Sequence, residues 1–114
     1  MKQAVRLADL VSFYKALASR SRLRILALLE ARPLCVNALA RSLGISQPAV
    51  SQHLEVLKRA RLVVGERVGT MVHYRLDREE IKSVEGSTAL LFGRSADAIH
   101  ARSKEGRDRE RRSQ

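Results

Sequence analysis

Polar side chains that can hydrogen-bond to nucleic-acid bases lie along one side of the stretch 46–61, SQPAVSQHLEVLKRAR. On a helical wheel of 3.6 residues per turn, Gln52 lies nearest the outward direction, with Ser51 on the same side. A side-chain amide can pair in two places with the edge of an adenine in a major groove. We therefore predict that Gln52 and Ser51 contact bases, and that Gln47 assists at a base or a phosphate.

Basic side chains close this stretch and continue beyond it. Lys58, Arg59 and Arg61 lie at its end, and Arg67 and Arg75 follow. Cations of this kind bind phosphate at any base sequence, so they add affinity and salt sensitivity without selecting a site. We expect all five to contact a nucleic-acid backbone.

The stretch has the features of a helix that buries its other side. Val50, Leu54 and Leu57 fall together on the wheel, opposite the polar residues. Ser46 can cap the first turn, and Pro48 lies within that turn, where a missing N–H costs little. The sequence therefore predicts one helix with a buried apolar face and an exposed polar face.

A second short amphipathic stretch, residues 36–45, precedes this helix and stops at Gly44. Helix, glycine turn and helix is the helix-turn-helix pattern, whose second helix lies in a major groove. The pattern assigns DNA recognition to the stretch 46–61.

Two strands, residues 62–68 and 71–76, are predicted after this helix, with Gly69 and Thr70 as the turn between them. Apolar and polar residues alternate in them, which indicates a ribbon with one polar face. We expect Arg67, His73 and Arg75 to share that face, opposite Val68, Val72 and Tyr74. A basic hairpin placed here would act as a wing that reaches the adjacent minor groove or backbone.

Three more helices complete the predicted domain, over residues 4–18, 20–31 and about 78–103. The first has a wide apolar stripe, which indicates burial on two sides, one of them against a partner subunit. The second is apolar nearly all round beyond its first turn, which is typical of a central helix. Its start contains three arginines that are either solvated, paired with acids or bound to phosphate: Arg20, Arg22 and Arg24.

Length and composition are consistent with one small basic domain. The chain has 114 residues and a net charge of +10, which favours a polyanionic partner. The chain has no tryptophan and few aromatic residues, so we do not expect a base-stacking platform. We assign residues 1–103 to the domain and expect the basic tail 104–114, which has no apolar residue, to be disordered.

The expected compartment is the cytoplasm, with no membrane association. The single cysteine excludes an internal disulfide framework and suits a reducing environment. The first residues contain no apolar run of signal-peptide length, and no stretch approaches the length of a membrane span.

Three segments resemble the ArsR/SmtB family of winged helix-turn-helix repressors: KALASRSRLRILALL (15–29), LCVNALARSL (34–43) and SQPAVSQHLEVLKRARLV (46–63). The resemblance implies a mainly helical winged domain that forms a homodimer through its first and last helices. It also implies repression at an inverted-repeat operator on double-stranded DNA until an effector binds. His53 then becomes a candidate DNA contact beside its ordinary role as a structural hydrogen-bonder. Arg61 departs from the family, which usually has glycine there.

The resemblance also directs attention to metal sites, and this chain has only parts of them. Cys35 matches the first thiol of the arsenic and lead type, but Asn37 replaces the second, and one thiol per chain is too few for such a site. Asp97 and His100 have the spacing of half of a zinc-type site on the last helix. A transition metal such as nickel or zinc is therefore one candidate effector, beside a buried apolar role for Cys35 and an ordinary surface pair for Asp97 and His100.

Other functions stay open at this point. No glycine-rich phosphate loop, nucleophile elbow or complete metal triad is present in the sequence, so we do not expect an enzyme. A winged helix without its own metal site can be controlled by an effector-binding partner protein or by a non-metal signal. A non-specific nucleic-acid-binding module is the remaining alternative.

Overall fold

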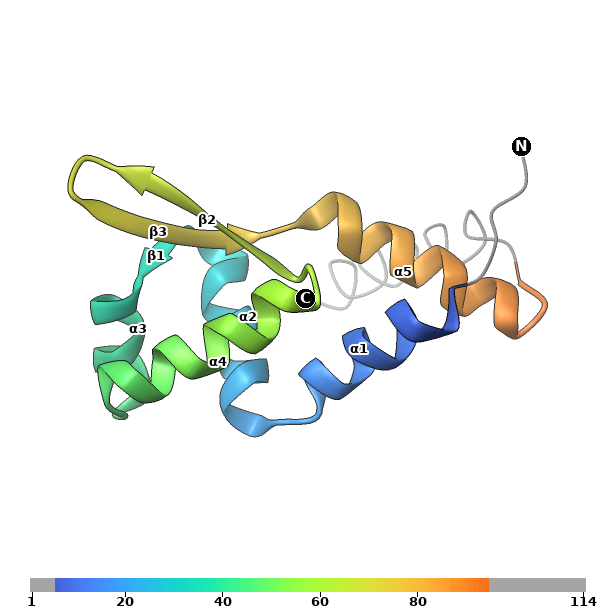
Figure 1. The fold of residues 1–114 in the computed structure, drawn as a ribbon, viewed down its shortest axis with the longest axis horizontal. Helices are drawn as coiled ribbons and strands as arrows, with labels where there is room; N and C mark the ends of the chain where they lie inside the picture. The colour runs from blue at the N-terminus through green and yellow to red at the C-terminus, as the bar shows by residue number, and fades with distance from the viewer. Residues whose placement is uncertain (1–5, 95–114) are drawn as a thin grey trace, which may run out of the picture.

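The computed structural model describes residues 6–94, which form five helices and three strands (Figure 1). In chain order these elements are α1 (Leu7–Leu17), α2 (Arg20–Ala31), β1 (Leu34–Cys35), α3 (Val36–Leu43), α4 (Gln47–Arg59), β2 (Val63–Val68), β3 (Met71–Leu76) and α5 (Arg78–Leu91). None of the helices in this part of the chain is long and apolar enough to cross a membrane.

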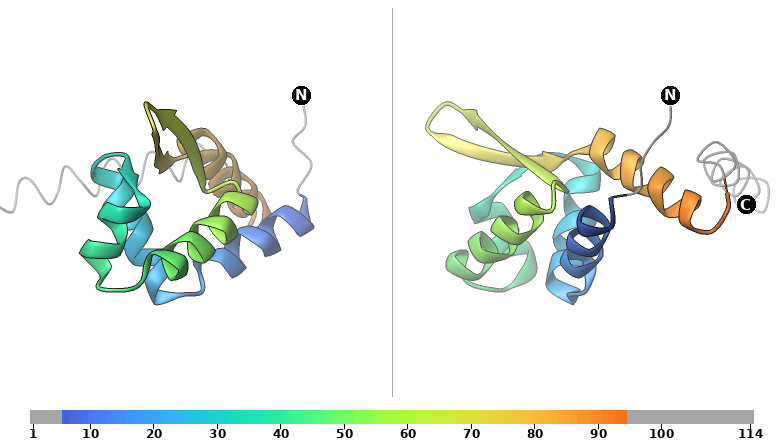
Figure 2. Two further views of the ribbon diagram at one scale, coloured as in Figure 1. Left: turned by 60° about the vertical axis from the view of Figure 1, so that its left-hand side comes forward. Right: turned by 45° about the vertical axis from the view of Figure 1, so that its right-hand side comes forward.

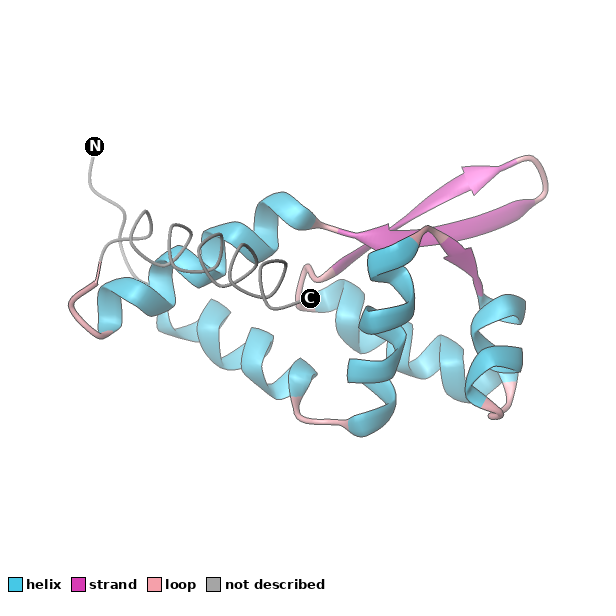
Figure 3. Ribbon diagram, turned by 180° about the vertical axis from the view of Figure 1, so that it is seen from behind, coloured by secondary structure: helices cyan, strands magenta, loops and turns pink. Residues whose placement is uncertain are grey.

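Helix α2 lies at the centre, between α1 and α5 on one side and α3 and α4 on the other (Figure 3). Its Ile25 and Leu29 are buried in the core, as the apolar pattern predicts. They pack in one cluster with side chains from α1, α3, α4 and β2. The largest fully buried side chains of that cluster, besides these two, are Leu39, Val50, Leu54, Leu57 and Leu62.

The helix-turn-helix forms as predicted. Helix α3 stops at Gly44, whose φ of 69° lies in the left-handed region that glycine tolerates best. The Ser46 hydroxyl accepts a hydrogen bond from the Ala49 N–H at 3.2 Å and caps α4. The turn therefore orients α4 against α3 through two local features, the left-handed Gly44 and the Ser46 cap.

Strands β2 and β3 form the predicted hairpin, which projects beyond the helices (Figure 2). The sheet order is β1-β3-β2, and the short strand β1 pairs with β3 although the sequence pattern did not predict it. Gly69 takes a φ of 65° at the turn, and Val68 pairs with Met71 as the closing residues.

The expected faces of the hairpin are wrong for both residues of β2, since Val68 pairs with Met71 and so lies on the face of His73 and Arg75. The register places Arg67 directly opposite Val72, and directly paired residues point to the same face of an antiparallel sheet. Arg67 therefore shares a face with Val72 and Tyr74, while His73 and Arg75 point to the other. Alternation within each strand was predicted correctly, but the closing pair sets the parity between the strands.

Helix α5 ends at Leu91, well before the predicted end near residue 103. Gly93 adopts a φ of 70°, and the Arg94 N–H donates to the Ala89 carbonyl at 2.8 Å, which closes the helix. Asp77 caps the other end of the helix by accepting from the Glu80 N–H at 3.1 Å. The remainder of the predicted helix and the tail 104–114 lie outside the described residues.

Candidate nucleic-acid interface

The outer side of α4 is the polar surface that the sequence predicts. Ser51 and Gln52 are exposed, whereas Val50 and Leu57 on the inner side are fully buried and Leu54 is 2% exposed. The buried side fixes the rotation of the helix about its own axis. The two predicted base-contacting side chains therefore face away from the domain.

Gln47, the first residue of α4, is also exposed, and its side chain makes a hydrogen bond to α3. Its Nε2 donates to Oδ1 of Asn37 at 2.5 Å, which joins the start of α4 to the first turn of α3. Asn37 could not be selected as a DNA-contacting residue from local spacing, because only the fold brings these two turns together.

His53 is half-buried, and its Nδ1 lies 3.4 Å from Nη1 of Arg22. The same guanidinium donates through Nε to the Ala16 carbonyl at 2.7 Å and through Nη2 to the Lys15 carbonyl at 3.3 Å. Arg22 thus satisfies carbonyls at the end of α1. Of the three arginines at the start of α2, Arg20 and Arg24 remain exposed.

The five predicted phosphate-binding cations differ in their surroundings. Arg75 pairs with Glu66 at 2.6 Å, Arg61 with Glu80 at 3.4 Å, and Arg59 with Glu55 at 3.8 Å. Within residues 6–94, Lys58 and Arg67 have no carboxylate within ion-pair distance. All five are exposed, so each remains within reach of a polyanion.

Of the predicted metal ligands, only Cys35 lies in the described part of the chain. It is half-buried at the start of α3 and lies opposite His73 in the β1–β3 pairing. Residues 6–94 contain no group of three or more histidine, cysteine or acidic side chains that could hold a metal ion. Asp97 and His100 lie outside the described residues, so the proposed half-site on the last helix stays a prediction.

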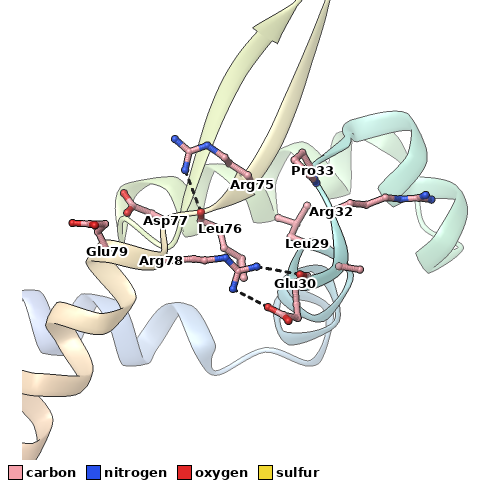
Figure 4. A pocket seen from close by; sticks show the side chains of 10 residues that line it. Leu29, Glu30, Arg32, Pro33, Arg75, Leu76, Asp77, Arg78 and Glu79 are labelled. Carbon is pink, nitrogen blue, oxygen red and sulfur yellow. Dashed lines mark hydrogen bonds and ion pairs between the residues drawn. The ribbon is translucent and has the colours of Figure 1, made fainter. Parts of the chain in front are cut away.

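A hollow of about 400 Å³ lies where α2 ends and α5 begins (Figure 4). Arg78 crosses it, donating to the Glu30 carboxylate at 2.9 Å and to the Glu30 carbonyl at 3.1 Å. Its lining carries both signs of charge, from Arg32, Arg75 and Arg78 and from Glu30, Asp77 and Glu79. This ion pair and the hydrogen bond to the carbonyl tie α5 to α2. Because the lining carries both signs of charge, the hollow favours neither anions nor cations.

An apolar surface covers the end of the molecule formed by α1 and α5, away from the hairpin (Figure 1). The two helices are joined by a 2.5 Å hydrogen bond between the hydroxyls of Tyr14 and Thr88. The predicted two-sided burial of α1 is only half satisfied within the chain, because Leu10 and Phe13 are buried while the other side is open. The exposed apolar residues of this surface are Leu7, Val11, Tyr14, Leu90, Leu91 and Phe92, the last 77% exposed.

A helix-turn-helix with a polar outer face, followed at once by an antiparallel hairpin, defines a winged helix-turn-helix domain. A model of bacterial regulatory proteins of the arsR family matches residues 19–64, which include α2, α3 and α4. The chain belongs to this arsR family, as the resemblance in its sequence indicates.

Three relatives illustrate the match. The transcriptional repressor SmtB homolog of Synechocystis is 42% identical over 76 residues, covering 67% of this chain and 55% of that protein. Nodulation protein NolR of Rhizobium meliloti is 33% identical over 87 residues, covering 76% and 71%. The chain thus spans little more than half the length of several curated relatives that it matches.

The third relative is a solved structure, the homodimeric winged helix-turn-helix DNA-binding domain of Mb0332 from Mycobacterium bovis, a possible ArsR-family regulator. It is 31% identical with a TM-score of 0.64, and the match covers 74% of this chain and 82% of that one. The likeness extends from sequence to three-dimensional fold.

Proposed function

We propose that this protein is a homodimeric transcriptional repressor that binds an inverted-repeat operator and is controlled by an effector. The observation that carries the proposal is the exposed polar side of α4, with Gln52 and Ser51 outward and a fully buried opposite side. A helix so held, with a hairpin beside it, fits a major groove with the wing over the neighbouring backbone.

Direct base contact is assigned to Gln52, with Ser51 beside it. The Gln52 amide has both a donor and an acceptor for an adenine edge. Lys58, in the last turn of α4, and Arg67, next to the closing pair of the hairpin, supply phosphate contacts together with the cations paired to carboxylates. The net charge of +10 adds a long-range attraction to DNA.

The open apolar side of α1 and α5 supports dimerisation. Six large apolar residues there are more than 40% exposed, and such a surface is typical of an interface between subunits. A two-fold axis at this end places the two α4 helices in successive major grooves about 34 Å apart, which requires an operator with inverted symmetry. The homodimeric Mb0332 domain supports this arrangement.

Two kinds of effector are candidates. A transition metal such as nickel or zinc is one candidate, through Asp97 and His100, and control by a partner protein or a non-metal signal is the other. Calorimetric titration of the reduced dimer with zinc and nickel separates them. Metal binding that weakens with His100→Ala but persists with Cys35→Ser supports the site on the last helix, whereas no tight binding in the unmodified protein favours the other candidate.

Sequence-specific binding is tested by replacing Gln52. Operators are first selected from a pool of random-sequence DNA, and binding is then measured to the selected operator and to an unrelated duplex. Gln52→Ala should lose about ten-fold of the preference for the operator. Lys58→Ala is the control, because loss of a phosphate contact weakens both DNAs alike.

Two results would contradict the proposal. If no inverted repeat is selected, the protein is a non-specific nucleic-acid-binding module. If Gln52→Ala weakens both DNAs equally, base recognition lies elsewhere. The assignment also implies that the domain has no catalytic activity, in agreement with relatives named as transcriptional regulators and repressors.

A further inference from the structure

Asn37 and Gln47 link the two helices of the helix-turn-helix through their side-chain amides. Gln47 Nε2 donates to Asn37 Oδ1 at 2.5 Å, and both side chains are exposed. Asn37 lies in the first turn of α3, and Gln47 is the first residue of α4. The pair therefore lies on the surface, at the end of the helix predicted to enter the groove.

After this hydrogen bond, each amide still has donors or acceptors that are free to bind DNA. A glutamine amide has two N–H donors and one carbonyl oxygen, so Gln47 retains one donor and its acceptor. The major-groove edge of adenine offers the complement, an acceptor at N7 and a donor at N6. Asn37 keeps both hydrogens of Nδ2, and a phosphate oxygen only accepts.

The bond also sets the orientation of the Gln47 amide before DNA arrives. An unattached glutamine side chain loses rotamer freedom when it is fixed at an interface, and pre-organisation removes part of that cost. Ser51 follows Gln47 by one helical turn, so the two side chains lie on the same flank of α4. The N-terminal residues of recognition helices are those that reach base edges.

We propose that Asn37 determines DNA specificity together with Gln47. Asn37 holds the Gln47 amide in the orientation that pairs with an adenine, and its own Nδ2 donates to the neighbouring phosphate. The inference rests on the proposed function, because both contacts require α4 to lie in a major groove.

Two substitutions of Asn37 separate its two roles. Asn37→Ala removes the acceptor that orients Gln47 and the phosphate donors together. Asn37→Asp keeps an oxygen for Gln47 Nε2 but replaces the donors by a negative charge. The probes are the operator selected by the unmodified protein and derivatives of it with each base of a half-site changed in turn. Gln47→Ala identifies the position that Gln47 contacts.

Gln47→Ala should abolish a preference for adenine of about ten-fold at one position of each half-site. Asn37→Ala should reduce the preference at that same position several-fold. Asn37→Asp should retain it while binding every DNA more weakly. Ratios between operators are compared within one variant, so a partly folded preparation does not change the result.

Three outcomes overturn the inference, and one of them affects the function as well. If the unmodified protein selects no inverted repeat, the proposed function fails and this inference fails with it. If it selects one but Asn37→Ala keeps the full adenine preference, only the role of Asn37 fails. If Asn37→Asp loses the preference as completely as Asn37→Ala, the accepting oxygen of residue 37 does not orient Gln47.

Discussion

The His53 imidazole lies 3.4 Å from the guanidinium of Arg22, which connects the middle of α4 to the start of α2. Through the same guanidinium, the connection continues to the last carbonyls of α1. Helix α1 contributes half of the open apolar surface assigned to dimerisation. One arginine thus joins the helix assigned to DNA recognition to a helix assigned to subunit contact.

Arg22→Ala should lower the free energy of unfolding by about 2 kcal/mol, since hydrogen bonds made by charged groups are among the stronger ones. Arg24→Ala is the matched control, because Arg24 is exposed on the same helix and its substitution removes the same charge. Urea unfolding of both variants measures the difference. Equal stability of the two variants would mean that the contacts of Arg22 with α1 and α4 contribute nothing.

Arg61→Gly should raise the free energy of unfolding by about 1 kcal/mol, because non-glycine residues are strained in the left-handed region. Arg61 has a φ of 61°, and the Leu62 N–H beyond it donates to the Leu57 carbonyl at 2.9 Å, as at a glycine-type helix end. The lost pair with Glu80 is exposed and contributes little. Thermal or urea unfolding tests this, with Glu80→Gln to measure the ion pair alone. A destabilised Arg61→Gly variant would contradict the strain argument.

Val11→Asp should dissociate the dimer, raising its dissociation constant at least about 100-fold, because two unpaired carboxylates would be buried per interface. Val68→Asp is the control: Val68 is 54% exposed and Val11 is 53% exposed, but Val68 lies on the hairpin. Sedimentation of both variants at several concentrations gives their association states. A dimer that withstands Val11→Asp would exclude this face of α1 from the interface.

Lys58→Ala should reduce the dependence of DNA affinity on salt. Each lost phosphate contact changes the slope of log K against log salt by about 0.9, hence about 1.8 per dimer. Arg75→Ala should change it less, because Arg75 is already neutralised by Glu66 at 2.6 Å. Titrations on one duplex at several salt concentrations measure both slopes. If Arg75→Ala gave the larger change, Glu66 would not hold Arg75 away from phosphate.

Local residues were sufficient to predict the helix-turn-helix and its exposed side. The features responsible act within one or two helical turns, so they can be recognised in the sequence. They are the cap residue Ser46, the turn residue Gly44 and the spacing of Val50, Leu54 and Leu57. The same holds for the hairpin, whose turn lies between its two strands. The short strand β1 escaped prediction because two residues have no pattern of their own and pair only with β3.

Contacts between residues far apart in the sequence determine which polar side chains interact. Asn37 meets Gln47, and Arg22 meets His53, because buried apolar faces bring α3 and α2 against α4, and no local spacing encodes those pairs. The pairing register likewise separated Arg67 from Arg75 across the sheet. The sequence by itself determined which elements form and which sides they bury, since both depend on neighbouring residues. Only the tertiary structure determined which polar side chains touch, because each such contact joins segments that packing brings together.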